Sequence, residues 1–219
     1  MQKNYPFAAV LFDLDGVIAD TTEMHYRLWD AFARRRGYTP MRAELLGTNG
    51  VRAAETMRKW FGPLSDGEIE TLTAEQAAYI NTVLDSEPLA AIPGAIDYID
   101  SLCRASIPRA VATSARPENA VRYLKNLGLS GKFGALITSA DVTQGKPHPG
   151  PYLKAAAQLG VSPGQCLVIE DSVSGIQSAK AAGARCLALM TTFPREILAP
   201  EKPDWLCQDF RDLPEMLRP

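Results

Sequence analysis

The chain has 219 residues, of which 46% are hydrophobic and 22% are charged, and its formal net charge is −2. This length allows one sizeable core or a core with a smaller inserted domain, and the composition excludes a disordered chain. The near-neutral charge gives no general attraction to nucleic acid, and no segment approaches the roughly 18 consecutive apolar residues that cross a bilayer. With no secretory-type N-terminal pattern either, we expect a cytoplasmic protein without nucleic-acid or membrane partners.

The first element is an apolar run from Phe7 to Phe12, which predicts a short buried strand. It ends at Asp13 and Asp15, with Gly16 directly after them. Residues two apart on an extended chain point the same way, so the two carboxylates leave the strand side by side. Their repulsion needs a cation or a shared proton to offset it, which indicates a site. Taken alone, the same residues are more typical of a structural role, with Asp15 and Gly16 in a turn and Asp13 capping a helix or ending the strand.

Helical patterns occupy the next part of the chain. Asp20 and Glu23 predict a capping box at the start of a helix that runs to about Arg36. No strand-like run follows for some sixty residues, and three further helices are expected, at 41–46, 51–61 and 65–84. We therefore predict an inserted helical cap domain over residues 19–89, and a core made of residues 1–18 and 90–219.

After about residue 92 the chain alternates between helices and strands. Apolar strands are expected at 109–113, 135–138, 166–169 and 186–190. Helices are expected at 95–103, 117–127, 149–159 and 173–182. The alternation predicts an α/β fold with a doubly wound, Rossmann-like parallel sheet covered by helices on both faces.

The four cysteines are widely separated and lie among apolar neighbours. They are Cys103, Cys166, Cys186 and Cys207. Without a C-x-x-C pair, buried reduced thiols are expected rather than a disulfide or a zinc site.

Polar side chains also follow the second and third predicted strands. In an open parallel sheet ligands bind beyond the carboxyl ends of the strands, so these positions are candidates for a site. Thr113 and Ser114 offer hydroxyls ahead of a helix, a setting that suits phosphate oxygens, although either one alone more commonly caps a helix. Lys146 lies between a glycine and a proline and offers a stiffly held cation for phosphate or carboxylate. An exposed lysine in a turn is the alternative for Lys146.

The fourth predicted strand ends in Glu170 and Asp171, which brings two more carboxylates to the same edge. Carboxylate oxygens are the ligands that Mg²⁺ prefers, and magnesium commonly keeps substrate phosphate oxygens among its ligands. The combined pattern fits phosphoryl transfer by an aspartate nucleophile with bound Mg²⁺.

These motifs resemble those of the haloacid dehalogenase (HAD) superfamily, in the branch that holds β-phosphoglucomutase and small sugar-phosphate phosphatases. The resemblance covers nearly the whole chain, in motif order and spacing and in the helical cap after the first motif. The four matching motifs are residues 13–17, 113–114, 145–147 and 170–172.

The resemblance implies a role for each matching residue. Asp13 attacks phosphorus and forms an aspartyl-phosphate, while Asp15 protonates the leaving oxygen and later activates water. Members that cleave carbon–halogen bonds lack an acid at the position of Asp15, so an oxygen leaving group and a phosphate monoester are expected. The implied Mg²⁺ ligands are the Asp13 carboxylate, the Asp15 backbone carbonyl and Asp171, with Glu170 beside them. The implied phosphate-binding residues are Ser114 and Lys146, with Thr113 adjacent.

Three residues in the predicted cap are candidates for contact with the substrate. Thr21 and His25 lie one helical turn apart on one face and match positions at the hinge and active-site side of the mutase cap. A packing role in the cap helix is the alternative for His25. The mutase pattern has a lysine and an arginine in this segment, and an alignment without gaps places Leu46 and Gly50 at those two positions. If the segment is aligned on Gly50 to Arg52 instead, the chain resembles sugar-phosphate phosphatases that keep a cap arginine, here Arg52. Either way a second phosphate clamp is weakened, which favours hydrolysis over a mutase reaction.

The leading hypothesis is a Mg²⁺-dependent phosphatase of a small phosphorylated metabolite, a sugar or polyol phosphate. A β-phosphoglucomutase-type phosphotransferase is the second hypothesis, and a catalytically silent binding protein on the same fold is the third. We expect a monomer or a weak homodimer.

Overall fold

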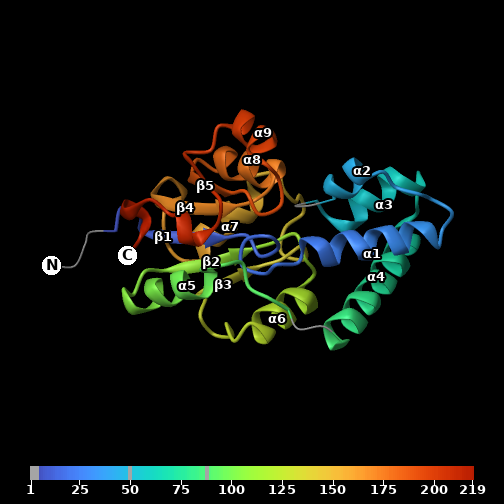
Figure 1. Cartoon of the computed structure of the whole chain (residues 1–219), viewed down its shortest axis with the longest axis horizontal. Helices are drawn as coiled ribbons and strands as arrows, with labels where there is room; N and C mark the ends of the chain where they lie inside the picture. Colours follow the sequence, from blue (N-terminus) through green and yellow to red (C-terminus); the bar gives the residue numbers. More distant parts are fainter. Residues whose placement is uncertain (1–4, 49–50, 87–88) are drawn as a thin grey trace.

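A six-stranded, all-parallel sheet forms the centre of the molecule, with the strand order β3-β2-β1-β4-β5-β6 (Figure 1). The computed structural model describes residues 5–48, 51–86 and 89–219, without side chains for 83–86. The strands are β1 (Ala9–Phe12), β2 (Arg109–Ala112), β3 (Ala135–Ile137), β4 (Cys166–Glu170), β5 (Arg185–Leu189) and β6 (Trp205–Cys207).

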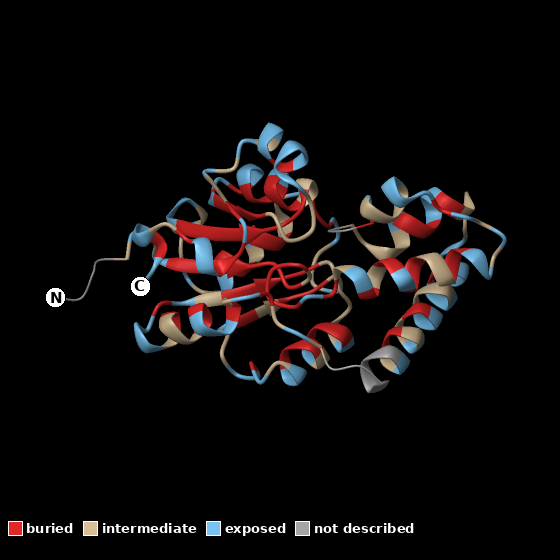
Figure 2. Ribbon diagram, viewed as in Figure 1, coloured by how far each residue is buried: buried red, intermediate tan, exposed pale blue. Residues whose placement is uncertain are grey.

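The central strand β1 is apolar at every position because helices cover both faces of the sheet. On one face, Phe12 packs with buried side chains of α5 (Ala95–Arg104) and α6 (Pro117–Asn126). On the other face, Leu11 packs with buried side chains of α7 (Gly150–Gln158) and α8 (Val173–Ala181). Figure 2 shows the strands as buried and the flanking helices with one buried and one exposed side. The predicted fold class is confirmed.

The register of the sheet brings the strand ends together. Phe12 pairs with Val111 of β2 and with Ile169 of β4. Because neighbouring parallel strands run in the same direction, the residues that follow them meet at one edge of the sheet.

Four helices form a separate unit between β1 and β2, here called the helical unit and defined as residues 22–86 (Figure 1). Its helices are α1 (Thr22–Arg34), α2 (Arg42–Leu46), α3 (Ala53–Phe61) and α4 (Asp66–Ser86). It has its own apolar cluster around Trp29 and Trp60, whose ring centroids lie 5.3 Å apart. The segments that lead into and out of the helical unit lie next to each other, and they are joined by a hydrogen bond from the N–H of Asp20 to Ala90 O at 2.9 Å. The domain division at residues 19–89 stays a prediction.

The shorter elements complete the chain. They are α9 (Arg195–Leu198) and the 3-10 segments η1 (Pro163–Gln165), η2 (Ala199–Glu201), η3 (Phe210–Asp212) and η4 (Glu215–Leu217). Within the described ranges, no helix has both the length and the apolar character needed to cross a membrane.

The predicted capping box at Asp20 and Glu23 is wrong. The N-cap of α1 is Thr21, and its side chain makes no capping hydrogen bond. The Thr21 hydroxyl instead donates to the Asp15 carboxylate at 2.8 Å, while Asp20 is exposed. A contact with the core has therefore replaced the local cap.

The sequence prediction also omitted β6, a three-residue strand at the edge of the sheet. The other predicted helices and strands are confirmed to within two residues at each end. Cys166, Cys186 and Cys207 are buried free thiols, as expected, whereas Cys103 is a free thiol that is only partly buried.

Candidate active site

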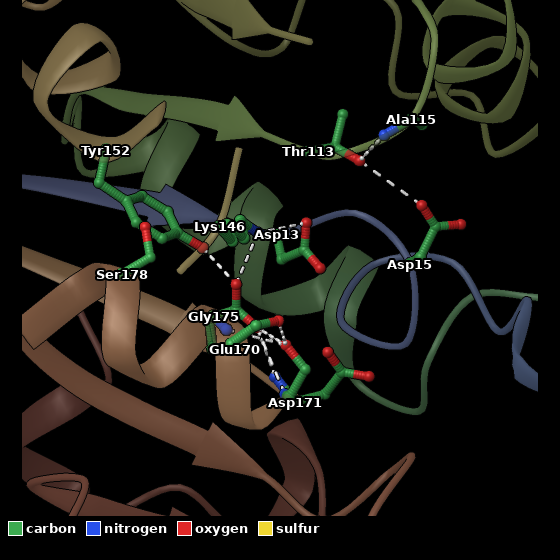
Figure 3. Close-up of polar contacts among 12 residues, drawn as sticks. Asp13, Asp15, Thr113, Ala115, Lys146, Tyr152, Glu170, Asp171, Gly175 and Ser178 are labelled. Atoms are coloured by element: carbon green, nitrogen blue, oxygen red, sulfur yellow. Dashed lines mark hydrogen bonds and ion pairs between the residues drawn. The ribbon is translucent and has the colours of Figure 1, made fainter. Parts of the chain in front are cut away.

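A buried lysine links the carboxylates that follow β1 and end β4. The Nζ of Lys146 lies 2.8 Å from Asp13 Oδ1 and 2.6 Å from Glu170 Oε1 (Figure 3). Lys146 is only 1% exposed, so the alternative of an exposed lysine in a turn is wrong. The segment between β3 and α7 thus delivers one ammonium group to the ends of the two central strands.

The side chain of Glu170 is fully engaged by the protein. In addition to Lys146, its Oε1 accepts from the hydroxyl of Tyr152 on α7 at 2.6 Å. Its Oε2 accepts from the backbone N–H of Asp171 at 3.0 Å and from the hydroxyl of Ser172 at 3.1 Å. Gly175 lies so close that an added Cβ would stand 1.8 Å from the carboxyl carbon of Glu170. This carboxylate is therefore fixed in place and holds Lys146.

Asp171 lies on the other side of the site, against the turn after β1. Its Oδ2 accepts a hydrogen bond from the hydroxyl of Thr192. Gly16, with a φ of +73°, passes so close that a Cβ there would lie 1.9 Å from Asp171 Oδ2. A glycine is needed at this position for both its left-handed conformation and the close approach.

Burial and neighbouring charges raise the pKa values of Asp13 and Asp171. Burial raises the pKa of Asp13 to about 7; Lys146 opposes this shift, and the charges of Glu170 and Asp15 add to it. Burial, followed by the charges of Glu170 and Asp13, raises the pKa of Asp171 well above its usual range. Burial alone would lower the pKa of Lys146, but Asp13 and Glu170 together raise it. One ammonium group therefore does not balance the carboxylates around it.

The same acidic residues can hold a metal ion. Oxygen atoms of Asp13, Glu170 and Asp171 all lie within 4.8 Å of one another. Carboxylate oxygens suit a hard divalent cation, and a cation here would offset the repulsion that raises the pKa values of Asp13 and Asp171. Because Glu170 is already saturated by protein donors, Asp13 and Asp171 are the carboxylates best able to act as ligands.

Asp15 stands apart from this cluster and faces the helical unit. Thr21 donates to its Oδ1 at 2.8 Å, and His25 Nε2 lies 3.6 Å from the same oxygen. The structure thus places both of these predicted residues at one carboxylate. His25 Nε2 also lies 3.5 Å from the hydroxyl of Tyr123 on α6. Asp15 is about one-fifth exposed, in contrast to the buried Asp13.

The predicted phosphate-binding hydroxyls follow β2. The Thr113 hydroxyl accepts from the N–H of Ala115 at 3.0 Å and lies 3.5 Å from Asp15 Oδ2 (Figure 3). Ser114 lines the cavity beside it. Both residues therefore belong to the same site as Asp13 and Asp15.

Arg52 lies at the cavity, but its guanidinium group is directed to the core backbone. It donates to the carbonyls of Thr143 at 2.9 Å and Ser139 at 3.2 Å, and also to that of Val142. In this structure Arg52 connects the start of α3 to the loop after β3.

A cavity of about 460 Å³ lies between the core and the helical unit. The core side presents polar groups, and the helical unit presents both polar and apolar groups. Lining residues from the core include Asp13, Asp15, Thr113, Ser114, Asp171 and Thr192. Those from the helical unit include His25, Trp29, Arg52, Gln76 and Ile80.

The sequence prediction missed two residues that support the acidic cluster. Thr192 follows the fifth predicted strand, so its position at a strand end was a usable signal. Tyr152 carried no such signal, because a tyrosine in an apolar helix is most often a packing residue.

This α/β fold has buried carboxylates at the ends of two central parallel strands, a buried lysine in contact with them and a cavity beside them. These features define an α/β enzyme. The family model described as haloacid dehalogenase-like hydrolase matches residues 7–183. The chain belongs to this family of hydrolases.

Individual relatives agree with this assignment. The chain is 32% identical over 207 residues to validoxylamine A 7'-phosphate phosphatase of Streptomyces hygroscopicus subsp. limoneus, covering 94% of this chain and 96% of the relative. It is 34% identical over 179 residues to hexitol phosphatase A of Escherichia coli, covering 82% of this chain and 81% of the relative. The crystal structure of a β-phosphoglucomutase from Clostridium difficile matches with a TM-score of 0.85 and 25% identity, covering 95% of this chain and 94% of that one.

Proposed function

We propose that this protein is a Mg²⁺-dependent phosphatase of small phosphorylated sugars or polyols that works through an aspartyl-phosphate. The observation that carries the proposal is the position of Asp13, which lies 2.8 Å from Lys146 Nζ, beside Asp171 and at the wall of the cavity. The relatives named as phosphatases of validoxylamine A 7'-phosphate and of hexitols support the substrate class.

In this proposal Asp13 is the nucleophile. Its carboxylate lines the cavity together with Thr113 and Ser114, and Lys146 contacts the same carboxylate from the buried side. Attack forms a bond between a carboxylate oxygen and phosphorus and releases the substrate's alcohol oxygen. Water then hydrolyses the aspartyl-phosphate and regenerates Asp13.

Asp15 is the general acid and base. It donates a proton to the leaving alcohol and then takes one from the attacking water. Thr21 and His25 hold its carboxylate on the side that faces the helical unit, and Thr113 borders it on the core side. Asp15 is outside the set of carboxylates that cluster for a metal, which suits a group that must exchange protons.

Asp13, Asp171 and the backbone carbonyl of Asp15 would hold the Mg²⁺. When bound, the ion supplies positive charge that offsets the charge of the phosphoryl oxygens and of the buried carboxylates. Glu170 acts differently, because its contacts with Lys146 and Tyr152 make it the group that positions the lysine.

Residues 19–89 act as a cap that closes the cavity and excludes water during attack by Asp13. Hydrolysis is favoured over a mutase reaction because Leu46 stands where the mutase pattern has a lysine, and because the Arg52 guanidinium is occupied by core carbonyls. Product analysis with a hexose 1-phosphate separates the two reactions: free phosphate supports the phosphatase, and a hexose 6-phosphate supports the mutase.

Replacing the nucleophile tests the mechanism directly. Asp13→Asn is expected to lower Mg²⁺-dependent phosphate release from an aryl phosphate and from a hexitol phosphate by at least about 10³-fold, because nucleophile removal typically costs several orders of magnitude. The variant should stay folded, since the change removes a buried charge while keeping the side-chain shape. Asp66→Asn, at a fully exposed position in α4, is the matched control and should keep wild-type activity. Substantial turnover by Asp13→Asn would refute the aspartyl-phosphate route.

A further inference from the structure

The cavity wall contains a buried amide oxygen that lacks a donor. Asn119 lies in the first turn of α6, lines the cavity and is only 6% exposed. Within residues 5–48, 51–86 and 89–219, no group donates a hydrogen bond to its Oδ1. Native proteins pair nearly all such atoms, because an unpaired buried acceptor loses its hydration without compensation. The Asn119 amide therefore has hydrogen-bonding capacity at the cavity wall that the described residues leave unused.

A second neutral amide lines the same cavity from the helical unit. Gln76 lies on α4 and is 8% exposed. None of the hydrogen bonds found among the described residues involves its side chain. The threonines nearby differ, because Thr48 donates to Leu45 O at 2.7 Å and Thr73 donates to Ile69 O at 2.8 Å. The two amides therefore stand out as polar groups left for a ligand.

The charged groups that line the cavity do not form a second phosphate site. Arg52 is held by backbone carbonyls, and His25 lies at Asp15. Arg116 faces the carboxylate of Glu118 at 3.6 Å, and Glu118 also lines the cavity. A second anionic group on the substrate would meet the Glu118 carboxylate as well as the Arg116 guanidinium, so this pair offers it no net positive charge.

We propose, building on the phosphatase function above, that Asn119 and Gln76 are specificity-determining residues that select a neutral, polyhydroxylated end on the substrate. The Asn119 amide forms a hydrogen bond with one hydroxyl. The Gln76 amide can both donate and accept, which matches the two capacities of a second hydroxyl. Trp29 and Ile80 supply apolar surface for the C–H groups of the same ligand. Substrates that lack hydroxyls leave these amides unpaired, and an ionised second phosphate accepts hydrogen bonds from them but donates none.

The test compares two substrates in each enzyme. The first is a hexitol phosphate, and the second is p-nitrophenyl phosphate, which has no hydroxyl groups. Asn119→Leu keeps the size of the side chain and removes the amide, so the kcat/KM ratio of hexitol phosphate to aryl phosphate should fall about tenfold, as expected for one lost hydrogen bond. Gln76→Leu should lower the same ratio. Asn126→Leu, at an exposed position on the same helix, should leave the ratio unchanged.

An unchanged ratio in both Asn119→Leu and Gln76→Leu would overturn the inference, and so would a wild-type preference for a bisphosphate over the hexitol phosphate. If Asn119→Leu does not fold, deoxy analogues of the hexitol phosphate test the same contact in the wild-type enzyme. Loss of one hydroxyl should then cost about tenfold in kcat/KM, whereas equal turnover of every analogue would overturn the inference. Cleavage of the aryl phosphate by the wild-type enzyme shows whether the proposed phosphatase function itself holds. If that function is wrong, the wild-type enzyme should cleave neither the aryl phosphate nor the hexitol phosphate.

Discussion

At the scale of single residues, the charge balance around Lys146 is central to the site. Its ammonium group contacts both Asp13 and Glu170, and its side chain is completely buried. Removing one partner of a buried ion pair leaves a charge without compensation, which commonly costs about 3–5 kcal/mol. Lys146 is therefore expected to contribute to stability as well as to the binding of phosphate.

Lys146→Met should lower the free energy of unfolding by about 3–5 kcal/mol at neutral pH, because two buried carboxylates lose their counter-charge. Urea unfolding followed by circular dichroism measures the effect. Lys132→Met is the matched control, since Lys132 pairs with Asp100 at a site where both side chains are about one-third exposed. Such pairs contribute about 0–1 kcal/mol. Equal stability losses in the two variants would contradict the central role given to the buried pair.

The sequence predicted which residues meet at the site because it predicted the strand ends correctly. Asp13, Glu170 and Asp171 come together because β1 and β4 are parallel neighbours, and Lys146 reaches them from the segment after the edge strand β3. Contacts that depend on side-chain direction were not predictable in this way. The hydrogen bond from Tyr152 to Glu170 requires knowledge of how α7 packs on the sheet, which periodicity does not contain.

At the scale of elements, the hydrophobic periodicity and the positions of the glycines were sufficient to predict most of the helices and strands. The start of α1 was predicted wrongly because a tertiary contact, from Thr21 to Asp15, took the side chain that a local rule assigns to capping. The edge strand β6 was missed because three residues are too few to establish a period. Local rules thus failed where the chain contributes to the site or where an element is very short.

Helix α8 provides a test of close packing under the active site. Its Gly175 lies against Glu170, which is held on several sides by hydrogen bonds. Gly175→Ala should destabilise the protein by about 1–3 kcal/mol or more, since overpacking in a filled core forces neighbours to move. Activity should fall as well, because Glu170 positions Lys146.

The control for this prediction is a glycine substitution that should increase the stability of the protein. At Gly67 in α4 an added Cβ meets no atom within 4 Å. Replacing a helical glycine by alanine without a clash stabilises a protein by about 0.4–1 kcal/mol. Thermal unfolding of Gly175→Ala and Gly67→Ala provides the comparison. A stability gain in both variants would show that Glu170 can move freely away from α8.

At the scale of the whole molecule, the sheet and the helical unit enclose a cluster of acidic groups that the protein alone does not neutralise. Burial, with the neighbouring carboxylates, raises the pKa of Asp13 from its ordinary 3.8 to about 7 and raises the pKa of Asp171 in the same direction. In the metal-free protein the folded state therefore binds more protons than the unfolded state between about pH 4 and pH 7. Across that window the contribution of these groups to the free energy of unfolding falls as the pH rises.

A metal ion bound to the same carboxylates should reverse this loss of stability at higher pH. Because the ion competes with protons for Asp13 and Asp171, Mg²⁺ should raise the unfolding temperature more at about pH 8 than at about pH 5, through its preference for the folded state. The measurement is thermal unfolding at both pH values with Mg²⁺ and with a chelator. Asp171→Asn should greatly reduce the Mg²⁺-dependent shift at the higher pH, whereas Asp66→Asn should leave it intact. A shift of equal size at both pH values would mean that the ion binds elsewhere, and that the charge imbalance at the strand ends is not what recruits it.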